Sequence, residues 1–194
     1  MTAQIGDIYR FKKNRYTIIA MSKPINFHPS HYGFKPTAPH TACWRGYCCE
    51  YIIKQDGLYL DKLEINCADG HYPALFGICA DESPEIRGSM KVYRNLNHRI
   101  NFTGNLVVGS GFIDAYYIHM GFQQAWAYKK VLEFLFDHEQ QVTVKDHSEL
   151  VKKIRDQIQK EPACMKQLLG ESLEYIAKSF SLDMADKCRW LTEP

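Results

Sequence analysis

The sequence predicts an α+β protein that is mainly β: an antiparallel β-sandwich or partly open barrel followed by two or three C-terminal helices. Most of the first 146 residues consist of short alternating runs rich in aromatic and β-branched side chains. An Asp-Gly pair separates two of these runs, which is typical of a hairpin. Past Asp146 the apolar residues recur at helical spacing. We therefore expect a β-rich domain over 1–146 and a helical appendage over 147–194, packed on that domain or on a partner.

Composition narrows the class of protein. The chain has 194 residues, 45% of them hydrophobic, and its 24 Lys and Arg nearly balance 22 Asp and Glu. Such a chain can bury a substantial core, and its net charge of +2 gives no overall attraction for nucleic acid or an anionic membrane. No apolar run approaches the length of a membrane helix. Seven scattered cysteines suit free thiols, so we expect a cytoplasmic protein.

The first predicted elements are a hairpin and a long loop. Strands over 6–11 and 16–20 flank a polar turn at 12–15. Residues 23–40 contain four prolines, too many for a helix or an inner strand, and we expect an ordered loop that packs on the body through its aromatics.

A second hairpin is predicted from two runs, 44–54 and 58–65, on either side of Asp56-Gly57. The alternation in the second run slips by one residue, because Leu58 and Leu60 are followed by Leu63 and Ile65. This slip predicts a β-bulge near Asp61-Lys62.

Further strands are expected at 75–79, 91–94, 102–108 and 112–119, with a turn at Gly109-Ser110-Gly111 joining the last two. Residues 123–135 also fit a helix. We favour a short helical turn near 123–128 and then strands over 131–136 and 141–145. In the tail, Ser148 is suited to cap a first helix, Pro162 to open a second, and Ser181 to cap a third that ends near Leu191.

One group of residues has spacing that resembles a metal site: His28-x-x-His31 followed by His40-x-x-Cys43. Imidazole and thiolate are natural zinc ligands. The interval is rich in proline and unlike a zinc knuckle, so packing explains these four residues better. We expect neither a metal ion nor a cofactor.

Adjacent Cys48 and Cys49 suggest redox chemistry, but neighbouring side chains on a strand point to opposite faces. A dithiol centre there is geometrically poor, and structural free thiols are the better interpretation. The chain also lacks the Gly-x-Ser-x-Gly, P-loop and Gly-x-Gly-x-x-Gly motifs.

Two segments form the candidate ligand-binding site. The first contributes Trp44, Arg45 and Tyr47, and the second contributes Tyr117 and His119, with Gln123 at the rim. Each ends at a glycine where strand pairing is expected to stop, so we predict that they meet at one end of the sheet. A satisfied structural histidine and a buried structural ion pair are the competing interpretations of His119 and Arg45.

The chain also resembles a group of small uncharacterised bacterial proteins. The resemblance covers roughly residues 5–145, without the helical tail. It lies in the segments 40–47, 56–60, 102–106 and 117–122, which read HTACWRGY, DGLYL, FTGNL and YIHMGF. It implies a β-rich fold in which these segments are neighbours and strands over 131–145. It implies no activity.

Three functions are compatible with these observations. The first is a binding or interaction domain for a protein or a small molecule, of the kind encoded beside bacterial toxins or defence systems. The alternative is a small-substrate hydrolase or transferase that uses the Trp44/Arg45 and Tyr117/His119 region. The third is a purely structural partner protein. A homodimer through the C-terminal helices is a further expectation.

Overall fold

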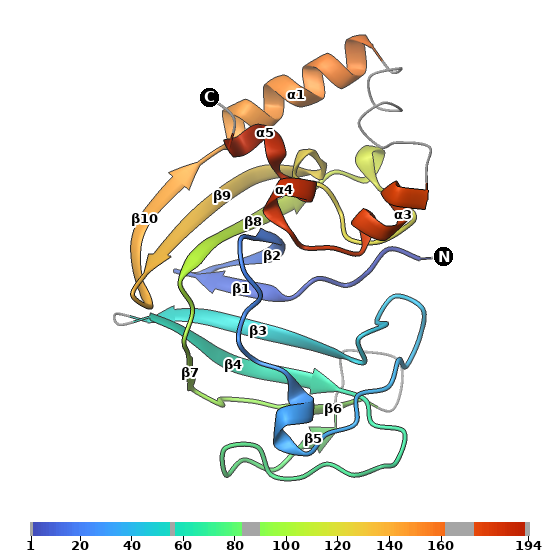
Figure 1. Ribbon diagram of the computed structural model, residues 1–194, viewed down its shortest axis with the longest axis vertical. Coiled ribbons are helices and arrows are strands. Elements are labelled where there is room, and N and C mark those ends of the chain that lie inside the picture. Colours follow the sequence, from blue (N-terminus) through green and yellow to red (C-terminus); the bar gives the residue numbers. More distant parts are fainter. Residues whose placement is uncertain (1, 55–56, 83–89, 162–172, 193–194) are drawn as a thin grey trace.

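The computed structural model describes residues 2–54, 57–82, 90–161 and 173–192 (Figure 1). These residues form one mixed sheet of ten strands in the order β10-β9-β8-β2-β1-β3-β4-β6-β5, with β7 paired to β4. The strands are β1 (Ile8–Phe11), β2 (Asn14–Met21), β3 (Tyr47–Lys54), β4 (Gly57–Ile65), β5 (Asp81–Glu82), β6 (Lys91–Tyr93), β7 (His98–Ile100), β8 (Gly104–Phe112), β9 (Tyr128–Asp137) and β10 (Gln140–Asp146). The predicted mainly β class is confirmed.

The helices lie mostly near the C-terminus. They are α1 (Ser148–Lys160), α3 (Leu173–Ser179), α4 (Met184–Lys187) and α5 (Arg189–Thr192), with 3-10 turns η1 (Pro29–Tyr32), η2 (Asp114–Tyr116) and η3 (Ala125–Ala127). The predicted helix start at Pro162 lies outside the described residues. Within the described part of the chain, no helix has the length and apolarity needed to cross a bilayer.

The sheet curls strongly without closing. Its two halves meet at one corner, where the turn between β9 and β10 reaches the start of β4. There a Cβ on Gly57 would lie 2.8 Å from the carbonyl oxygen of Glu139, and the Glu139 carboxylate lies 3.6 Å from Arg99. The partly open barrel is therefore the better of the two predicted architectures.

One strand pair departs from the predicted antiparallel arrangement. β1 and β3 run parallel, with Tyr9 opposite Tyr51. Residues 22–46 separate β2 from β3, and a connection of that length can return the chain to the other edge of β1 in the same direction. The long loop predicted over 23–40 supplies most of this crossover.

The predicted bulge in β4 is confirmed. Glu50 lies opposite Lys62 and Tyr51 lies opposite Leu60, so Asp61 is the extra residue. Leu60 and Leu63 both reach the main core, and the bulge places Asp61 and Lys62 together on the outer face.

The hairpin predicted at residues 109–111 is wrong. β8 runs straight through Gly109, and the chain then turns into η2, not into a strand over 112–119. A Cβ on Gly109 would lie 2.5 Å from Cγ of Tyr128 and 2.6 Å from Cδ1 of Ile19. A glycine is needed here because neighbouring side chains approach the backbone closely. From the sequence alone, such a glycine cannot be distinguished from one that forms a turn.

Two other uncertain regions are resolved. Residues 75–78 form a tight turn with reciprocal backbone hydrogen bonds between Leu75 and Ile78, so the predicted strand there is wrong. Left-handed backbone at Phe76 and Gly77 prevents an extended run. The preferred interpretation of 123–145, a helical turn followed by two strands, is confirmed by η3, β9 and β10.

The sheet separates two apolar clusters. The main core fills the concave side and includes Tyr9, Leu60 and Phe134. A second cluster lies on the opposite face of β2, β8 and β9, where Val107 and Val131 meet apolar residues of the tail. Figure 1 shows α1, α4 and α5 gathered beside β8 and β9, and the buried apolar residues that the tail adds to this cluster are Val151, Ile158, Met184, Cys188 and Leu191.

Candidate functional site

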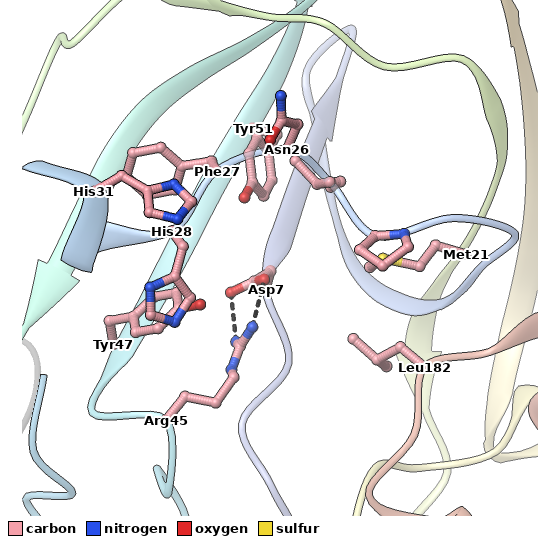
Figure 2. A pocket seen from close by; sticks show the side chains of 12 residues that line it. Asp7, Met21, Asn26, Phe27, His28, His31, Arg45, Tyr47, Tyr51 and Leu182 are labelled. Carbon is pink, nitrogen blue, oxygen red and sulfur yellow. Dashed lines mark hydrogen bonds and ion pairs between the residues drawn. The ribbon is translucent and has the colours of Figure 1, made fainter.

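A cavity of about 310 Å³ lies between the start of β3, the residues before β1 and the crossover loop (Figure 2). Its wall contains two of the predicted site residues, Arg45 and Tyr47, and two of the metal candidates, His28 and His31. The remaining lining residues are Asp7, Met21, Pro24, Ile25, Asn26, Phe27, Tyr51 and Leu182.

The Arg45 guanidinium is held by the Asp7 carboxylate in a two-point ion pair. The distances are 3.0 Å from Nη1 to Oδ2 and 2.7 Å from Nη2 to Oδ1, and the backbone N–H of Cys49 also donates to Oδ1 at 2.8 Å. Asp7 is buried, whereas the Arg45 side chain remains 31% exposed. Burial alone would lower the pKa of Arg45, but the Asp7 carboxylate outweighs it and the pKa rises above its usual range. The guanidinium is therefore charged, oriented and partly open to the cavity.

Two imidazoles come from the 3-10 turn η1. His28 precedes the turn and its Nδ1 accepts a hydrogen bond from the backbone N–H of Ser30 at 3.3 Å, so the neutral ring carries its proton on Nε2. The ring of His28 lies 5.5 Å from the Tyr47 ring and 5.9 Å from the His31 ring. Pro29 fits the first position of the turn because it needs no N–H there.

Aromatic side chains supply much of the remaining wall. Phe27, Tyr47 and Tyr51 line the cavity together (Figure 2). Burial raises the pKa of Tyr47 to about 12 and raises the pKa of Tyr51 well above its usual value. Both phenols keep their protons at neutral pH and are hydrogen-bond donors, not bases.

A second cavity of about 310 Å³ lies on the other side of Arg45. It shares Met21, Pro24, Arg45 and Leu182 with the first and adds residues from three places: the end of β2, the loop before η3 and the segment between α3 and α4. The guanidinium carbon of Arg45 is 4.9 Å from the centre of the Tyr47 ring and 5.9 Å from that of Phe122. Arg45 thus separates two adjoining hollows. The added residues are Ser22, Lys23, Phe122, Phe180, Ser181 and Asp183.

The predicted site residues divide into two groups. Trp44 is 57% exposed and stacks on Phe180, with ring centres 5.5 Å apart. Tyr117 and His119 contact each other, with ring centres 5.0 Å apart, beside Phe112. The two groups make separate ring contacts.

The two predicted segments are linked through the N-terminal residues. The backbone N–H of Gln4 donates to the Gly121 carbonyl at 2.8 Å, and its side-chain oxygen accepts from the Trp44 N–H at 3.1 Å. Gln123 bonds both the N–H and the carbonyl of Ile118, which clamps its own loop. Gly121 and Phe122 therefore approach the Arg45 region, while Tyr117 and His119 lie in a neighbouring loop.

The four metal candidates do not assemble. His28 and His31 line the cavity, the backbone carbonyl of His40 accepts the backbone N–H of Cys43, and the Cys43 thiol contacts Cys48. Across the residues that the structure describes, no three His, Cys, Asp or Glu side chains are grouped as a metal site requires.

Sequence reasoning did not find Asp7, Asn26, Phe27 or Tyr51. Asp7 stood out in the sequence only as the one acidic residue before Glu50. No local pattern identifies its partner, because β1 meets β3 only through the parallel pairing.

No family model, curated protein or solved structure matches this chain. The resemblance to the bacterial group therefore stays a prediction, and the argument for function rests on the geometry.

Proposed function

We propose that the protein is a binding domain and that the cavity beside Arg45 takes a small planar ligand with acceptor oxygens, such as an aromatic carboxylate or carboxamide. The observation that carries the proposal is the preorganised Arg45–Asp7 pair in the wall of an aromatic-lined cavity. A volume of about 310 Å³ is at the lower end of the range for small-molecule pockets.

The polar groups of the wall favour acceptors on the ligand. Arg45 uses one N–H of each Nη on Asp7 and keeps further N–H groups, since a guanidinium has five donors. The His28 ring, whose Nδ1 accepts from the Ser30 N–H, offers its Nε2–H, and Tyr47 and Tyr51 remain protonated. Asp7 offsets the charge of Arg45, so a neutral or singly charged ligand fits better than a polyanion.

The same observations support binding over the hydrolase or transferase alternative. A general base needs a pKa near the working pH. Burial moves the pKa of Tyr47 and Tyr51 away from neutrality, and the Asp7 carboxylate is occupied by Arg45 and by the Cys49 N–H. The cavity wall thus holds groups that orient a ligand, and the enzyme alternative would depend on His28 or His31 as the base.

The proposed cellular location, origin and oligomeric state come mainly from the sequence. The buried free thiols support a cytoplasmic location, and the bacterial origin rests on the resemblance alone. The association with a toxin or defence system is part of the proposal for a binding domain. A homodimer through the tail has less apolar surface to use, because Val151 and Ile158 of α1 already pack on the chain's own sheet.

A fragment screen tests this proposal. Monocyclic and bicyclic aromatic carboxylates and carboxamides should raise the melting temperature, because a ligand that binds only the folded state stabilises it. Arg45→Lys keeps the positive charge but loses the planar guanidinium that can donate two parallel hydrogen bonds, and Asn26→Ala removes an amide from the cavity wall. Each should weaken the affinity of the best fragment about tenfold, a loss of roughly 1.4 kcal/mol in binding free energy.

The matched control is His138→Ala, which removes an imidazole that is 97% exposed in the β9–β10 turn. Its affinity for the fragments should equal that of the wild type. A screen without hits, or hits unaffected by Arg45→Lys, would contradict the proposal. Chemical conversion of a fragment during incubation with the protein, followed by NMR, would establish the enzyme alternative.

A further inference from the structure

Two thiols lie against each other at the turn that carries Arg45. The sulfurs of Cys43 and Cys48 are 3.8 Å apart, and the residues are only 4% and 9% exposed. They form a small buried cluster with Met90, apart from the two larger apolar clusters. Both are free thiols.

The turn between them is tightly built. The Gly46 N–H donates to the Cys43 carbonyl at 3.1 Å, and Gly46 has a φ of 76°. A Cβ at Gly46 would lie 2.5 Å from the backbone nitrogen of Thr37, so only glycine fits. β3 begins at Tyr47, and the Cys43 sulfur also contacts the Tyr47 carbonyl oxygen at 3.7 Å.

Neighbouring Cys49 points the other way. It belongs to the main core on the concave side of the sheet, whereas Cys48 joins Cys43 and Met90. The strand geometry that excludes a Cys48–Cys49 centre thus leaves Cys48 facing a different thiol, five residues earlier in the chain.

We propose that Cys43 and Cys48 form a reversible intramolecular disulfide when the protein meets a two-electron oxidant of the peroxide class. The Cys43 thiolate attacks one peroxide oxygen, the O–O bond breaks, and water leaves after the released hydroxide takes a proton. The Cys48 thiol then attacks the Cys43 sulfenic acid, the S–S bond forms, and the S–OH oxygen leaves as a second water. Two thiols are oxidised and one hydrogen peroxide is reduced to two waters.

The geometry supports both steps. An S–S bond is about 2.05 Å long, so the sulfurs need to approach by roughly 1.8 Å, within the reach of side-chain rotation. The hydrogen bond from Cys48 lowers the pKa of Cys43 against the opposing effect of burial, and the Arg45 charge acts in the same direction. We therefore assign the first attack to Cys43 and the second to Cys48, and the disulfide formed is the same in either order.

The bridge would close a ring around Trp44, Arg45, Gly46 and Tyr47. Two of these residues line the proposed ligand cavity, so oxidation would alter that wall; this consequence rests on the proposed function, but its test uses no ligand. Failure of the redox proposal is thus distinguishable from failure of the binding proposal.

Peptide mapping tests the bridge directly. The folded full-length protein is treated with hydrogen peroxide, alkylated under denaturing, non-reducing conditions and digested with trypsin. Cleavage after Arg15, Arg45 and Lys54 gives peptides 16–45 and 46–54, because the two intervening lysines precede proline. We expect these peptides to be linked, with full release by dithiothreitol and with a mass about 2 Da below the sum of the two peptides that carry free thiols at Cys43 and Cys48 and the alkyl group at Cys49.

Three alanine variants assign the partner. Cys43→Ala and Cys48→Ala should abolish the link, whereas Cys49→Ala is the matched control and should keep it. Free 16–45 and 46–54 in oxidised wild type would overturn the proposal. So would a link that survives Cys48→Ala but is lost in Cys49→Ala.

An NMR comparison tests the effect on the cavity. Asp7 and His28 are distant from the turn in sequence but line the same cavity as Arg45. Their signals should shift on oxidation of the wild type and return on reduction, and they should stay fixed in Cys48→Ala. If they do not move although the peptides are linked, the coupling to the cavity is wrong.

Discussion

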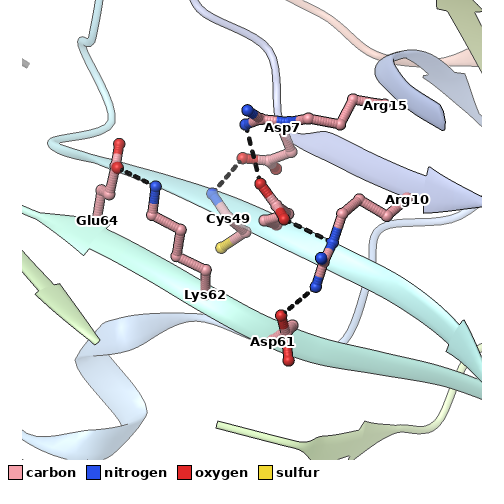
Figure 3. Close-up of polar contacts among 8 residues, drawn as sticks. Asp7, Arg10, Arg15, Cys49, Asp61, Lys62 and Glu64 are labelled. Carbon is pink, nitrogen blue, oxygen red and sulfur yellow. Dashed lines mark hydrogen bonds and ion pairs between the residues drawn. The ribbon is translucent and has the colours of Figure 1, made fainter. Parts of the chain in front are cut away.

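The two halves of the sheet differ in the residues on their outer face, which is the face turned away from the main core. On β2, β8 and β9 this face is apolar, and Val107 and Val131 pack with Trp126 and the tail helices. On β1, β3 and β4, and at the start of β2 around Arg15, it carries ion pairs (Figure 3). Arg10 Nε lies 2.7 Å from Glu50, Arg15 lies 2.9 Å from the same carboxylate, Arg10 also pairs with Asp61, and Lys62 lies 2.6 Å from Glu64.

The difference shows which half depends on the tail. Burying a large apolar side chain is worth about 1.5–3 kcal/mol, whereas an exposed ion pair is worth roughly 0.2–1 kcal/mol. Removing an apolar contact on the helix-covered half should therefore cost far more stability than removing the exposed partner of an ion pair, such as Arg15, on the other half.

The largest effect is expected for Trp126→Ala. Trp126 is 1% exposed and packs on Trp190 with ring centres 4.8 Å apart. The cavity left behind should lower the free energy of unfolding by about 3–5 kcal/mol in urea denaturation. Trp44→Ala is the control, since that indole is mostly exposed, and its cost should stay below about 1 kcal/mol. Equal losses of free energy of unfolding in Trp126→Ala and Trp44→Ala would contradict the expected dependence of stability on the helix-covered half.

The next largest effect concerns a buried lysine on the helix-covered half. Lys187 is 1% exposed and its Nζ donates to the carbonyls of Ser179 and Phe122 at 3.0 and 3.2 Å. Burial lowers its pKa to about 8, so between pH 8 and the unfolded value near 10.5 the unfolded state binds more protons. Stability should therefore rise with pH in this window, by at most about 3 kcal/mol.

Lys187→Met isolates this contribution. Urea denaturation from pH 7 to 10.5 should show the wild type gaining stability relative to the variant, while Lys152→Met, in the exposed face of α1, follows the wild type. If the difference in free energy of unfolding between wild type and Lys187→Met stayed constant across this pH range, the pKa of Lys187 would not be lowered in the folded state.

A smaller effect is expected for Glu133→Gln. The Glu133 carboxylate lies 2.8 Å from Nε2 of buried His147, and this hydrogen bond lowers the pKa of Glu133. The variant should lose about 1–3 kcal/mol at pH 7. The stabilisation is present above the ordinary glutamate pKa near 4.5 and is lost as pH falls through the lower folded value, so the difference should shrink in acid. Glu149→Gln, at the exposed start of α1, is the control.

The smallest effect is expected on the charged half. The Arg15 side chain is 60% exposed, and Arg15→Ala should cost less than about 1 kcal/mol. Because salt screens exposed charges, this cost should decline further between 0.05 and about 1 M NaCl in thermal or urea denaturation. A loss above 2 kcal/mol that persists in salt would mean that the ion pairs are as important as the apolar cover.

Local patterns predicted the elements whose cause is local. The antiparallel pair β3–β4, the bulge at Asp61 and the strand pair β9–β10 depend on neighbouring residues, so they could be predicted from alternation and turn chemistry. Gly109 shows the limit of this reasoning. A glycine is required at this position because the side chains of Tyr128 and Ile19, on other strands, leave no room for a Cβ.

The sequence by itself determined a mainly β fold, an apolar tail that has to be covered and a balance of charge without a strong field. Periodicity and composition are properties of the chain alone, and they suffice for these conclusions. Tertiary structure decided the partners. The parallel pairing of β1 with β3 brings Asp7 to Arg45, the 22–46 crossover adds His28 to the same cavity, and the turn at Gly46 sets Cys43 against Cys48. Each is a contact between side chains whose proximity depends on strand order and chain reversal, which no local pattern encodes.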